Sequence, residues 1–425
     1  MNNGTKKTAA LLIALCLAFA LLSGCIVKPE YLAESRYIPT ASPVSFTPEP
    51  TAIPEPPRPT AEPLPEQEEA KKDSRQTDPA PIEGEEGYYY SFLTEAQKQA
   101  YREIKRALDE HSQQRYDLST SDLGEAYIAH DHLMRDCAKY YYDDMYYYMQ
   151  DGGSVYLFRN TDDFSWVDQE LAAIDAQTDE ILSSVPPGAS EYETVKCFYE
   201  WLCRNISYEH SDRDQIIPSA FIDKKTVCAG YARALQYLCN RSGIQCAVVF
   251  GLGDNKTTPP EDHVWDLVRI DGRYYWVDAT WGDPLGTENT PDAFVSYYFL
   301  CTTDEFLFRT HTLYPFEGDY GPDHSYSVPY PACEDESLLY SKQFGLFFDL
   351  YDRRTVENGI VEYLKAGRDP KLILQFKIPN DVVRFETESL PSILQVLREN
   401  GVNQYTQYQS VYYDRDGYIE IQFLP

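Results

Sequence analysis

The 425-residue sequence predicts an α+β fold whose core is a helix that starts at a cysteine and packs on an antiparallel β-sheet. The segment "TVCAGYARALQYLCNRSG" has helical periodicity and ends in a glycine, a residue typical of helix C-caps. The apolar run "IQCAVVFGLG" that follows indicates a buried strand. Next, "HVWDLVRI" and "RYYWVDATW" are joined by Asp271-Gly272, a strong signal for a two-residue hairpin turn.

The N-terminus has the pattern of an exported bacterial lipoprotein. Lys6 and Lys7 precede an apolar run over 9–22, and these 14 residues are fewer than the roughly 20 that a membrane-spanning helix needs. The run ends in "LLSGC", which resembles a lipobox. We therefore expect residues 1–24 to be a signal peptide and Cys25 to carry lipid, which anchors the protein on the extracellular face of the cell membrane. An ordinary signal peptide and an uncleaved anchor are the alternatives.

Residues 25–88 are expected to form a disordered stalk rich in proline and glutamate. The segment 26–88 holds 13 of the chain's 28 prolines and few large apolar residues. Such a composition cannot bury enough surface to fold, and proline-rich chain is semi-extended. The stalk would hold a folded body away from the bilayer.

The rest of the chain has the composition of globular protein, and its roughly 335 residues exceed one ordinary domain of about 100–200 residues. The formal net charge of −31 excludes nucleic acid and anionic membrane surfaces as partners, because both would repel it. Apart from Cys16 and Cys25, the cysteines are irregularly spaced and form no C-x-x-C pair, so neither a metal nor a cofactor is predicted. An exported protein can form disulfide bonds, and the spacing of these cysteines does not predict which of them would pair.

Residues 89–186 are predicted to be a mainly helical region. Thr94 and Gln97 have the spacing of a capping box at the start of one helix. A second helix over 165–185 is stopped by two prolines. Between them, an aromatic stretch suggests a helix end, a turn and a strand. The histidines of "HDH" at 130–132 do not face one way on a helix, so we expect them to be solvated or to cap, and not to bind metal.

Two further domains follow. The core is expected over 187–330, and it includes a helical stripe in "SEYETVKCFYEWLCRNISYE". Residues 335–425 are expected to form a small α/β domain without a recognisable chemical motif. Its predicted elements are strands over 344–350, 371–378, 407–413 and 417–423, and helices over 354–367 and 389–400.

Cys228 lies in the first turn of its predicted helix. The helix N-terminus carries partial positive charge and unpaired N–H groups, which stabilise a thiolate and lower a cysteine pKa below its ordinary value of about 8.5. Cys228 is therefore a candidate nucleophile, and its own N–H can help to bind an oxyanion. We expect Ala229 and Gly230 to leave room beside the sulfur for an acyl group. A buried structural cysteine is the alternative.

The predicted hairpin supplies a base and its orienter. With a two-residue loop at Asp271-Gly272, His263 and Asp278 share one face and are diagonal neighbours, about 7–8 Å apart at Cα. A carboxylate at that distance can reach an imidazole and select its tautomer. Asp266 projects to the other face and is a poor orienter. Singly, each residue has a structural alternative; together, they predict a Cys-His-Asp triad.

These motifs carry a resemblance to a known family. The Cys228 helix with its following strand, the hairpin up to "DATWGDP", and the upstream "CRNISYE" resemble the transglutaminase-like superfamily, whose fold is similar to papain-type cysteine proteases. The resemblance implies Cys228 as nucleophile, His263 as base and Asp278 as orienter. Asp266 is a departure, because the pattern there is often Asn. In this family, the second hydrogen-bond donor to the oxyanion comes from a residue upstream of the helix that carries the cysteine.

Ser219 and Tyr208 are both candidates for that donor. Two classes of function then remain. The first is an enzyme that acts on peptide or glutamine amide bonds of a substrate at the cell envelope, through an acyl-thioester, with hydrolysis favoured over cross-linking. The second is a non-catalytic binding module at the cell surface that retains the triad. The intact triad favours the enzyme.

Overall fold

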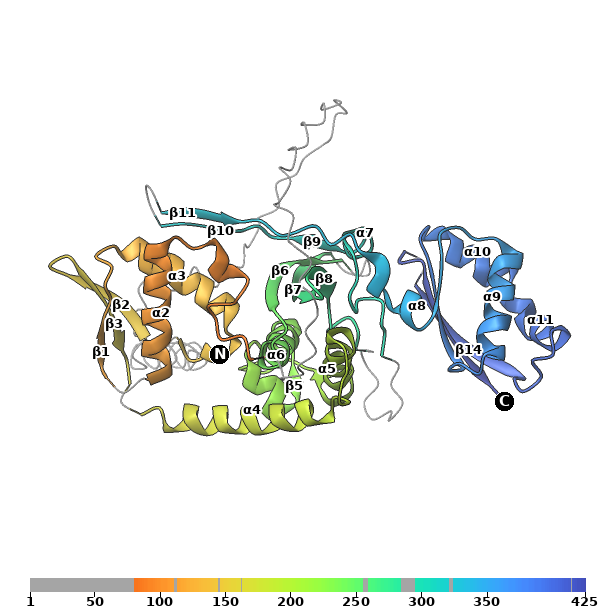
Figure 1. The fold of residues 1–425 in the computed structure, drawn as a ribbon, viewed down its shortest axis with the longest axis horizontal. Helices are drawn as coiled ribbons and strands as arrows, with labels where there is room; N and C mark the ends of the chain where they lie inside the picture. Colours follow the sequence, from red (N-terminus) through yellow and green to blue (C-terminus); the bar gives the residue numbers. More distant parts are fainter. Residues whose placement is uncertain are drawn as a thin grey trace, which may run out of the picture. The chain divides into compact units, whose positions relative to one another are not determined.

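Figure 1 shows the computed structural model, which describes residues 80–110, 113–143, 146–161, 163–254, 259–283, 295–320, 324–413 and 415–425. The predicted signal peptide, Cys25 and most of the predicted stalk lie outside the described residues. Within the described ranges, no helix is both long enough and apolar enough to cross a membrane.

The N-terminal region combines helices with a small sheet. The predicted capping box is confirmed: Gln97 accepts from the Thr94 N–H at 2.8 Å, and Thr94 Oγ1 accepts from the Gln97 N–H at 3.3 Å. Where one strand was expected, three form an antiparallel sheet in the order β1-β3-β2. The elements are η3 (Tyr89–Phe92), α2 (Glu95–Glu110), β1 (Arg115–Asp117), α3 (Leu123–Asp136), η4 (Ala138–Tyr140), β2 (Tyr146–Asp151), β3 (Ser154–Arg159) and α4 (Ser165–Ser184).

The expectation for "HDH" was wrong for His132, which is buried on α3. Its Nδ1 donates to the Ile128 carbonyl at 2.8 Å, and burial lowers its pKa to about 4. His130 points elsewhere, to the Tyr148 hydroxyl at 2.7 Å. Residues two apart on a helix face different ways, so one histidine joins the core while the other stays half-buried.

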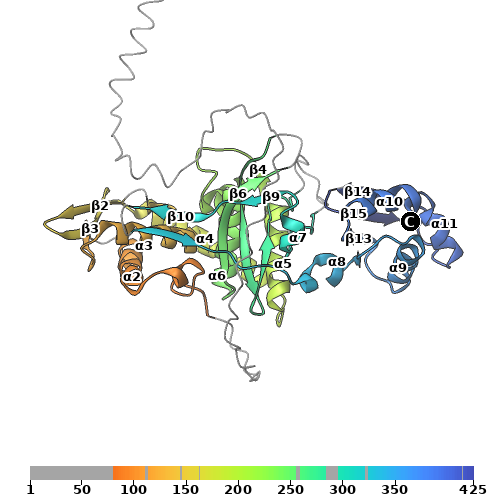
Figure 2. The same ribbon diagram turned by 90° about the horizontal axis from the view of Figure 1, so that it is seen from above.

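The core is an antiparallel sheet in the order β8-β7-β6-β9, with α6 packed against β6 and β7 and α5 against α6 (Figures 1 and 2). This arrangement confirms the predicted α+β core. The hairpin tryptophans Trp265 and Trp276 are both buried within it. The elements are α5 (Glu191–Asn205), β4 (Ser207–Tyr208), η6 (Ser219–Asp223), β5 (Lys225–Thr226), α6 (Cys228–Arg241), β6 (Cys246–Gly253), β7 (Glu261–Ile270), β8 (Arg273–Val277), α7 (Asp304–Leu307), β9 (His311–Leu313), β10 (Phe316–Asp319) and β11 (Ser325–Val328).

The C-terminal part forms a four-stranded sheet in the order β12-β13-β15-β14 with helices packed on it. The predicted strands and helices are present, and α10 is an additional helix. Two residues of this sheet, Ile373 of β13 and Tyr418 of β15, belong to the hydrophobic cluster of the central core. The elements are η7 (Glu336–Leu338), α8 (Tyr340–Gln343), β12 (Leu346–Phe348), α9 (Arg353–Lys365), β13 (Lys371–Phe376), α10 (Asn380–Glu388), η8 (Leu390–Ser392), α11 (Ile393–Glu399), β14 (Gln407–Tyr413) and β15 (Tyr418–Leu424).

Candidate active site

The β7–β8 hairpin has the predicted register. Asp271 and Gly272 have φ values of +49° and +82°, as a type I′ turn requires. The ladder runs from Ile270 opposite Arg273 to Asp266 opposite Val277. The two-residue loop is therefore confirmed. Its length sets the register of the two strands, and the register decides which of their side chains share a face of the sheet.

Beyond Val277 the chain leaves the ladder. The Asp278 N–H donates to the Phe299 carbonyl at 3.0 Å, so Asp278 does not pair with β7. The β7–β8 ladder ends at Asp266 and Val277, so His263 pairs only on the other side of β7, with Gly251 of β6. The departure changes the backbone partners, while Asp278 still faces His263.

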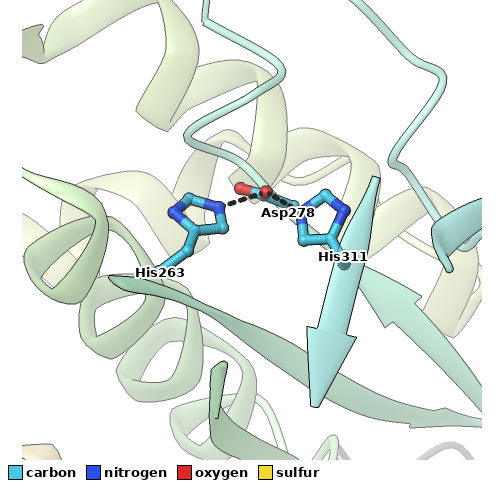
Figure 3. Close-up of side chains that lie close together, drawn as sticks. All are labelled: His263, Asp278 and His311. Atoms are coloured by element: carbon cyan, nitrogen blue, oxygen red, sulfur yellow. Dashed lines mark hydrogen bonds and ion pairs between the residues drawn. The ribbon is translucent and has the colours of Figure 1, made fainter. Parts of the chain in front are cut away.

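His263 and Asp278 form a direct hydrogen bond. His263 Nε2 lies 2.7 Å from Asp278 Oδ2, within the predicted range of about 2.6–3.2 Å. Both side chains are buried, with His263 7% exposed and Asp278 0% exposed. Figure 3 shows the carboxylate next to the His263 ring. The predicted geometry between these two residues is therefore confirmed.

The pair behaves electrostatically as an ion pair. Burial alone would lower the pKa of His263, but the charge and hydrogen bond of Asp278, with a further contribution from Cys228, raise it to about 10. Burial alone would raise the pKa of Asp278, but the two imidazoles beside it hold that pKa well below its usual range. A buried His⁺–Asp⁻ pair follows, with the imidazolium stable at neutral pH.

Cys228 is the first residue of α6, and Val227 is the N-cap. Its side chain is partly exposed, so it can meet a substrate. Cys228 contributes to the raised pKa of His263, so its thiol lies within electrostatic range of that ring. Because Nε2 of that ring faces Asp278, Nδ1 is the nitrogen available to Cys228. The structure thus brings the three predicted residues together.

Ala229 and Gly230 have another role than the one expected. Ala229 is buried in a small cluster with Val248 and Val264, against which Cys228 itself packs. A Cβ on Gly230 would lie 1.7 Å from Thr226 Oγ1. The expectation of free space was wrong because these small side chains allow close packing of the first turn of α6.

The two candidate oxyanion donors differ in how their hydroxyls are used. Ser219 is fully buried, and its Oγ lies 2.7 Å from the Ile216 carbonyl and 2.6 Å from Thr226 Oγ1. Tyr208 is 39% exposed, and its pKa is raised to about 12 by burial and then by Cys228. The Tyr208 hydroxyl is thus within electrostatic range of Cys228, whereas the Ser219 hydroxyl is already hydrogen-bonded to the Ile216 carbonyl and the Thr226 hydroxyl.

Asp266 is fully buried and takes no part in the His263 contact. Its Oδ1 accepts from Cys246 Sγ at 3.4 Å, and burial raises the pKa of its carboxyl well above the usual range. The prediction that Asp266 is a poor orienter agrees with this position.

Sequence reasoning missed His311 of β9. Its Nε2 lies 3.1 Å from the same Asp278 Oδ2, so one carboxylate oxygen contacts two imidazoles (Figure 3). The other oxygen, Oδ1, accepts from the Trp281 N–H at 3.1 Å. No sequence signal pointed to His311, which is 33 residues beyond Asp278 on a three-residue strand.

Two histidines and an aspartate so close together could also hold a metal ion. The nitrogen–oxygen distances of 2.7 and 3.1 Å are those of hydrogen bonds. Ligand atoms around a tetrahedral zinc ion lie about 3.3 Å apart, given bonds of about 2.0–2.1 Å. Protons between these atoms therefore explain the observed spacing better than an ion does.

Comparison with known proteins assigns the core to a family. Residues 180–279 match the model of the transglutaminase-like superfamily. The chain carries a transglutaminase-like domain. The match contains Cys228, His263 and Asp278, whereas His311 lies beyond it.

Similar proteins include kyphoscoliosis peptidase of Mus musculus, which is 32% identical over 170 residues, 36% of this chain and 25% of the relative. The Homo sapiens kyphoscoliosis peptidase is 31% identical over 160 residues, 34% of this chain and 23% of the relative. The chain thus spans about a quarter of the length of these curated relatives. A TGase crystal structure is 17% identical, with a TM-score of 0.24, and covers 36% of this chain and 47% of its own.

Proposed function

We propose that the transglutaminase-like domain is a cysteine enzyme that acts on peptide or glutamine amide bonds through Cys228, His263 and Asp278. The observation that carries this proposal is the His263–Asp278 hydrogen bond: Nε2 is held by Asp278 at 2.7 Å, which leaves Nδ1 for the partly exposed Cys228, whose charge also acts on the ring. An imidazole fixed at one nitrogen and free at the other is suited to carry a proton to and from a nucleophile.

In the first half-reaction, Cys228 Sγ attacks the carbonyl carbon of the amide. The C–N bond breaks, the imidazolium of His263 gives its proton to the leaving amine, and an acyl-thioester forms. The proposed oxyanion donors are the Cys228 N–H at the start of α6 and the Tyr208 hydroxyl, which is within electrostatic range of Cys228. Asp278 stays ionised and stabilises the imidazolium.

The second half-reaction decides between hydrolysis and cross-linking. His263 removes a proton from the incoming nucleophile, which attacks the thioester carbon and releases the Cys228 thiolate. Water yields a carboxylic acid, and an amine yields a new amide. We favour hydrolysis, since water is abundant outside the cell and the sequence offers no recognisable amine site.

We also propose that the domain works at the extracellular face of a bacterial membrane, anchored through lipid on Cys25 and acting on peptides or proteins of the cell envelope. Support comes from the signal-like N-terminus and from the proline-rich segment that follows it. Intact-mass measurement on the membrane fraction should show cleavage before Cys25 and an added lipid mass. A mature protein that keeps Lys6 and Lys7 would overturn the anchor.

Paired assays test the enzymatic proposal. The full-length protein is assayed for peptide hydrolysis and for amine incorporation into a glutamine-bearing protein, beside Cys228→Ala. We expect turnover in the hydrolysis assay and none in the variant, because the nucleophile is lost. An alkylating reagent, mapped by peptide mass spectrometry, should label Cys228 before the buried Cys203 and Cys239.

The opposite results are equally informative. Turnover that survives Cys228→Ala would belong to something else. Inactivity across a broad substrate panel, with Cys228 no more reactive than a model thiol, would favour a binding module. Amine incorporation that outpaces hydrolysis would reverse the preference between the two outcomes.

A further inference from the structure

The Asp278 carboxylate accepts three hydrogen bonds in a site closed to water. Oδ2 receives Nε2 of His263 at 2.7 Å and Nε2 of His311 at 3.1 Å, and Oδ1 receives the Trp281 N–H at 3.1 Å. Asp278 and His311 are 0% and 3% exposed. The triad as proposed uses only the first of these bonds. His311 is thus a buried titratable group that the mechanism leaves unused.

The positions of the protons follow from the acceptor. An ionised carboxylate only accepts hydrogen bonds, so both Nε2 atoms carry a proton. His311 Nδ1 lies 3.0 Å from Thr310 Oγ1, and burial lowers the pKa of His311. The Thr310 hydroxyl also lies 3.4 Å from the Leu307 carbonyl, and a neutral His311 with its proton on Nε2 offers it the closer acceptor, Nδ1. His311 is therefore a neutral donor oriented at both ends.

The ring of His311 is also fixed by packing. It lies among the rings of Trp281, Trp265 and Phe299, with centroids 4.6, 5.0 and 5.2 Å away. Its strand, β9, pairs with β6, and a Cβ on Gly251 would lie 2.0 Å from the Thr312 carbonyl oxygen. Such close approach leaves β9 little freedom to shift, so the donor is held in place before any substrate binds.

We propose that His311 is a positioning residue: its Nε2–H fixes Asp278 Oδ2, and Asp278 in turn keeps the His263 ring in the orientation that presents Nδ1 to Cys228. His311 acts through Asp278 and does not touch the substrate. The proposal rests on the proposed function, and it adds a residue from outside the part of the chain that matches the family model.

Two substitutions separate donation from packing. His311→Phe keeps an aromatic ring among Trp281, Trp265 and Phe299 and removes the donor. His311→Gln keeps an amide N–H near the position of Nε2. The matched control is His132→Phe, which also removes a buried histidine packed among aromatic rings, far along the chain from the triad.

We expect His311→Phe to lower kcat by about 10–100-fold with KM little changed, because loss of positioning affects the chemical step. His311→Gln should restore most of kcat. The alkylation rate of Cys228 should follow the same order. His132→Phe should cost a similar amount of thermal stability and leave kcat and the alkylation rate unchanged. A His311→Phe protein as active as wild type, or a His311→Gln protein as poor as His311→Phe, would overturn the proposal.

A measurement that needs no substrate keeps this proposal separate from the proposed function. In ¹⁵N spectra of histidine-labelled full-length protein, His263 and His311 should both be protonated at Nε2, and His311 should be unprotonated at Nδ1. His311→Phe should broaden or shift the His263 signals, and His311→Gln should leave them close to wild type. Unchanged His263 signals in His311→Phe would refute positioning even in a protein for which no substrate is found. Inactive protein with the expected spectra would refute the function alone.

Discussion

Two buried aspartates, one in the core and one in the N-terminal region, accept three hydrogen bonds each and yet differ in the direction of their pKa shift. Asp278 accepts from two imidazoles and a backbone N–H, and its pKa is held well below the usual range. Asp136 accepts from the Tyr89 and Tyr90 N–H groups at 3.0 and 2.8 Å and from the Tyr101 hydroxyl at 3.3 Å. Burial nevertheless raises the pKa of Asp136 to about 8.

The difference lies in charge, since the number of donors is the same. The donors around Asp136 are neutral, and they do not offset the cost of taking a carboxylate out of water. Asp278 faces an imidazolium, whose charge adds to the hydrogen bonds. A buried carboxylate with neutral donors joins chain segments, whereas one paired with a titratable cation can take part in proton transfer.

Replacing each aspartate by asparagine should separate the two roles most strongly. Asp278→Asn places an amide against two Nε2–H donors, which favours the wrong His263 tautomer, so we expect kcat to fall by about 10²–10⁴-fold. Asp136→Asn should leave kcat unchanged. Hydrolysis assays and the alkylation rate of Cys228 measure the effect. Equal losses in the two variants would show that the comparison reflects stability only.

Stability should depend on pH in opposite directions at the two sites. The pKa of Asp136 rises from 3.8 to about 8 on folding, so its contribution to stability is greatest below pH 3.8 and is lost as pH rises through about 8. The pKa of Asp278 falls on folding, so its contribution is present above pH 3.8 and is lost in acid.

Urea unfolding midpoints measured from pH 3 to pH 9 test this difference. Asp136→Asn should flatten the decline in stability between about pH 4 and pH 8. Asp278→Asn should leave that decline in place below about pH 6.5, and above it should remove the part of the decline that comes from the raised pKa of His263. Curves for the wild type and Asp136→Asn that run parallel over this range would contradict the assignment of a neutral buried carboxyl at Asp136.

The smallest expected effect comes from one neutral donor. Tyr101→Phe removes the hydroxyl that bonds Asp136 at 3.3 Å and should lower the free energy of unfolding by about 1 kcal/mol. Tyr90→Phe is the control, because its hydroxyl donates to Glu85 and accepts from Arg102, two partly exposed side chains away from the Asp136 carboxyl, and we expect a smaller change. Denaturant titration distinguishes the two. A Tyr101→Phe protein as stable as wild type would mean that the Asp136 site depends on its backbone donors alone.

Much of the proposed catalytic site could be predicted because it depends on local rules. The start of α6 at Cys228 follows from helical periodicity, and the capping box of α2 from the spacing of Thr94 and Gln97. The hairpin register follows from Asp271-Gly272, whose positive φ values permit a two-residue turn. Strand parity then brings His263 and Asp278 to one face, even though Asp278 leaves the ladder.

The sequence by itself thus determined the elements and the pairing of residues that are close along the chain, since backbone geometry repeats every 2 residues in a strand and about every 3.6 in a helix. Only the tertiary structure decided what reaches Asp278 from elsewhere. His311 arrives on β9, whose pairing with β6 joins distant segments, and no local pattern encodes that pairing. Packing against Thr226 likewise decided that Gly230 permits close approach and that the Ser219 hydroxyl is occupied. Such contacts depend on which surfaces meet after the chain has folded, and a periodic pattern within one segment carries no information about its distant partner.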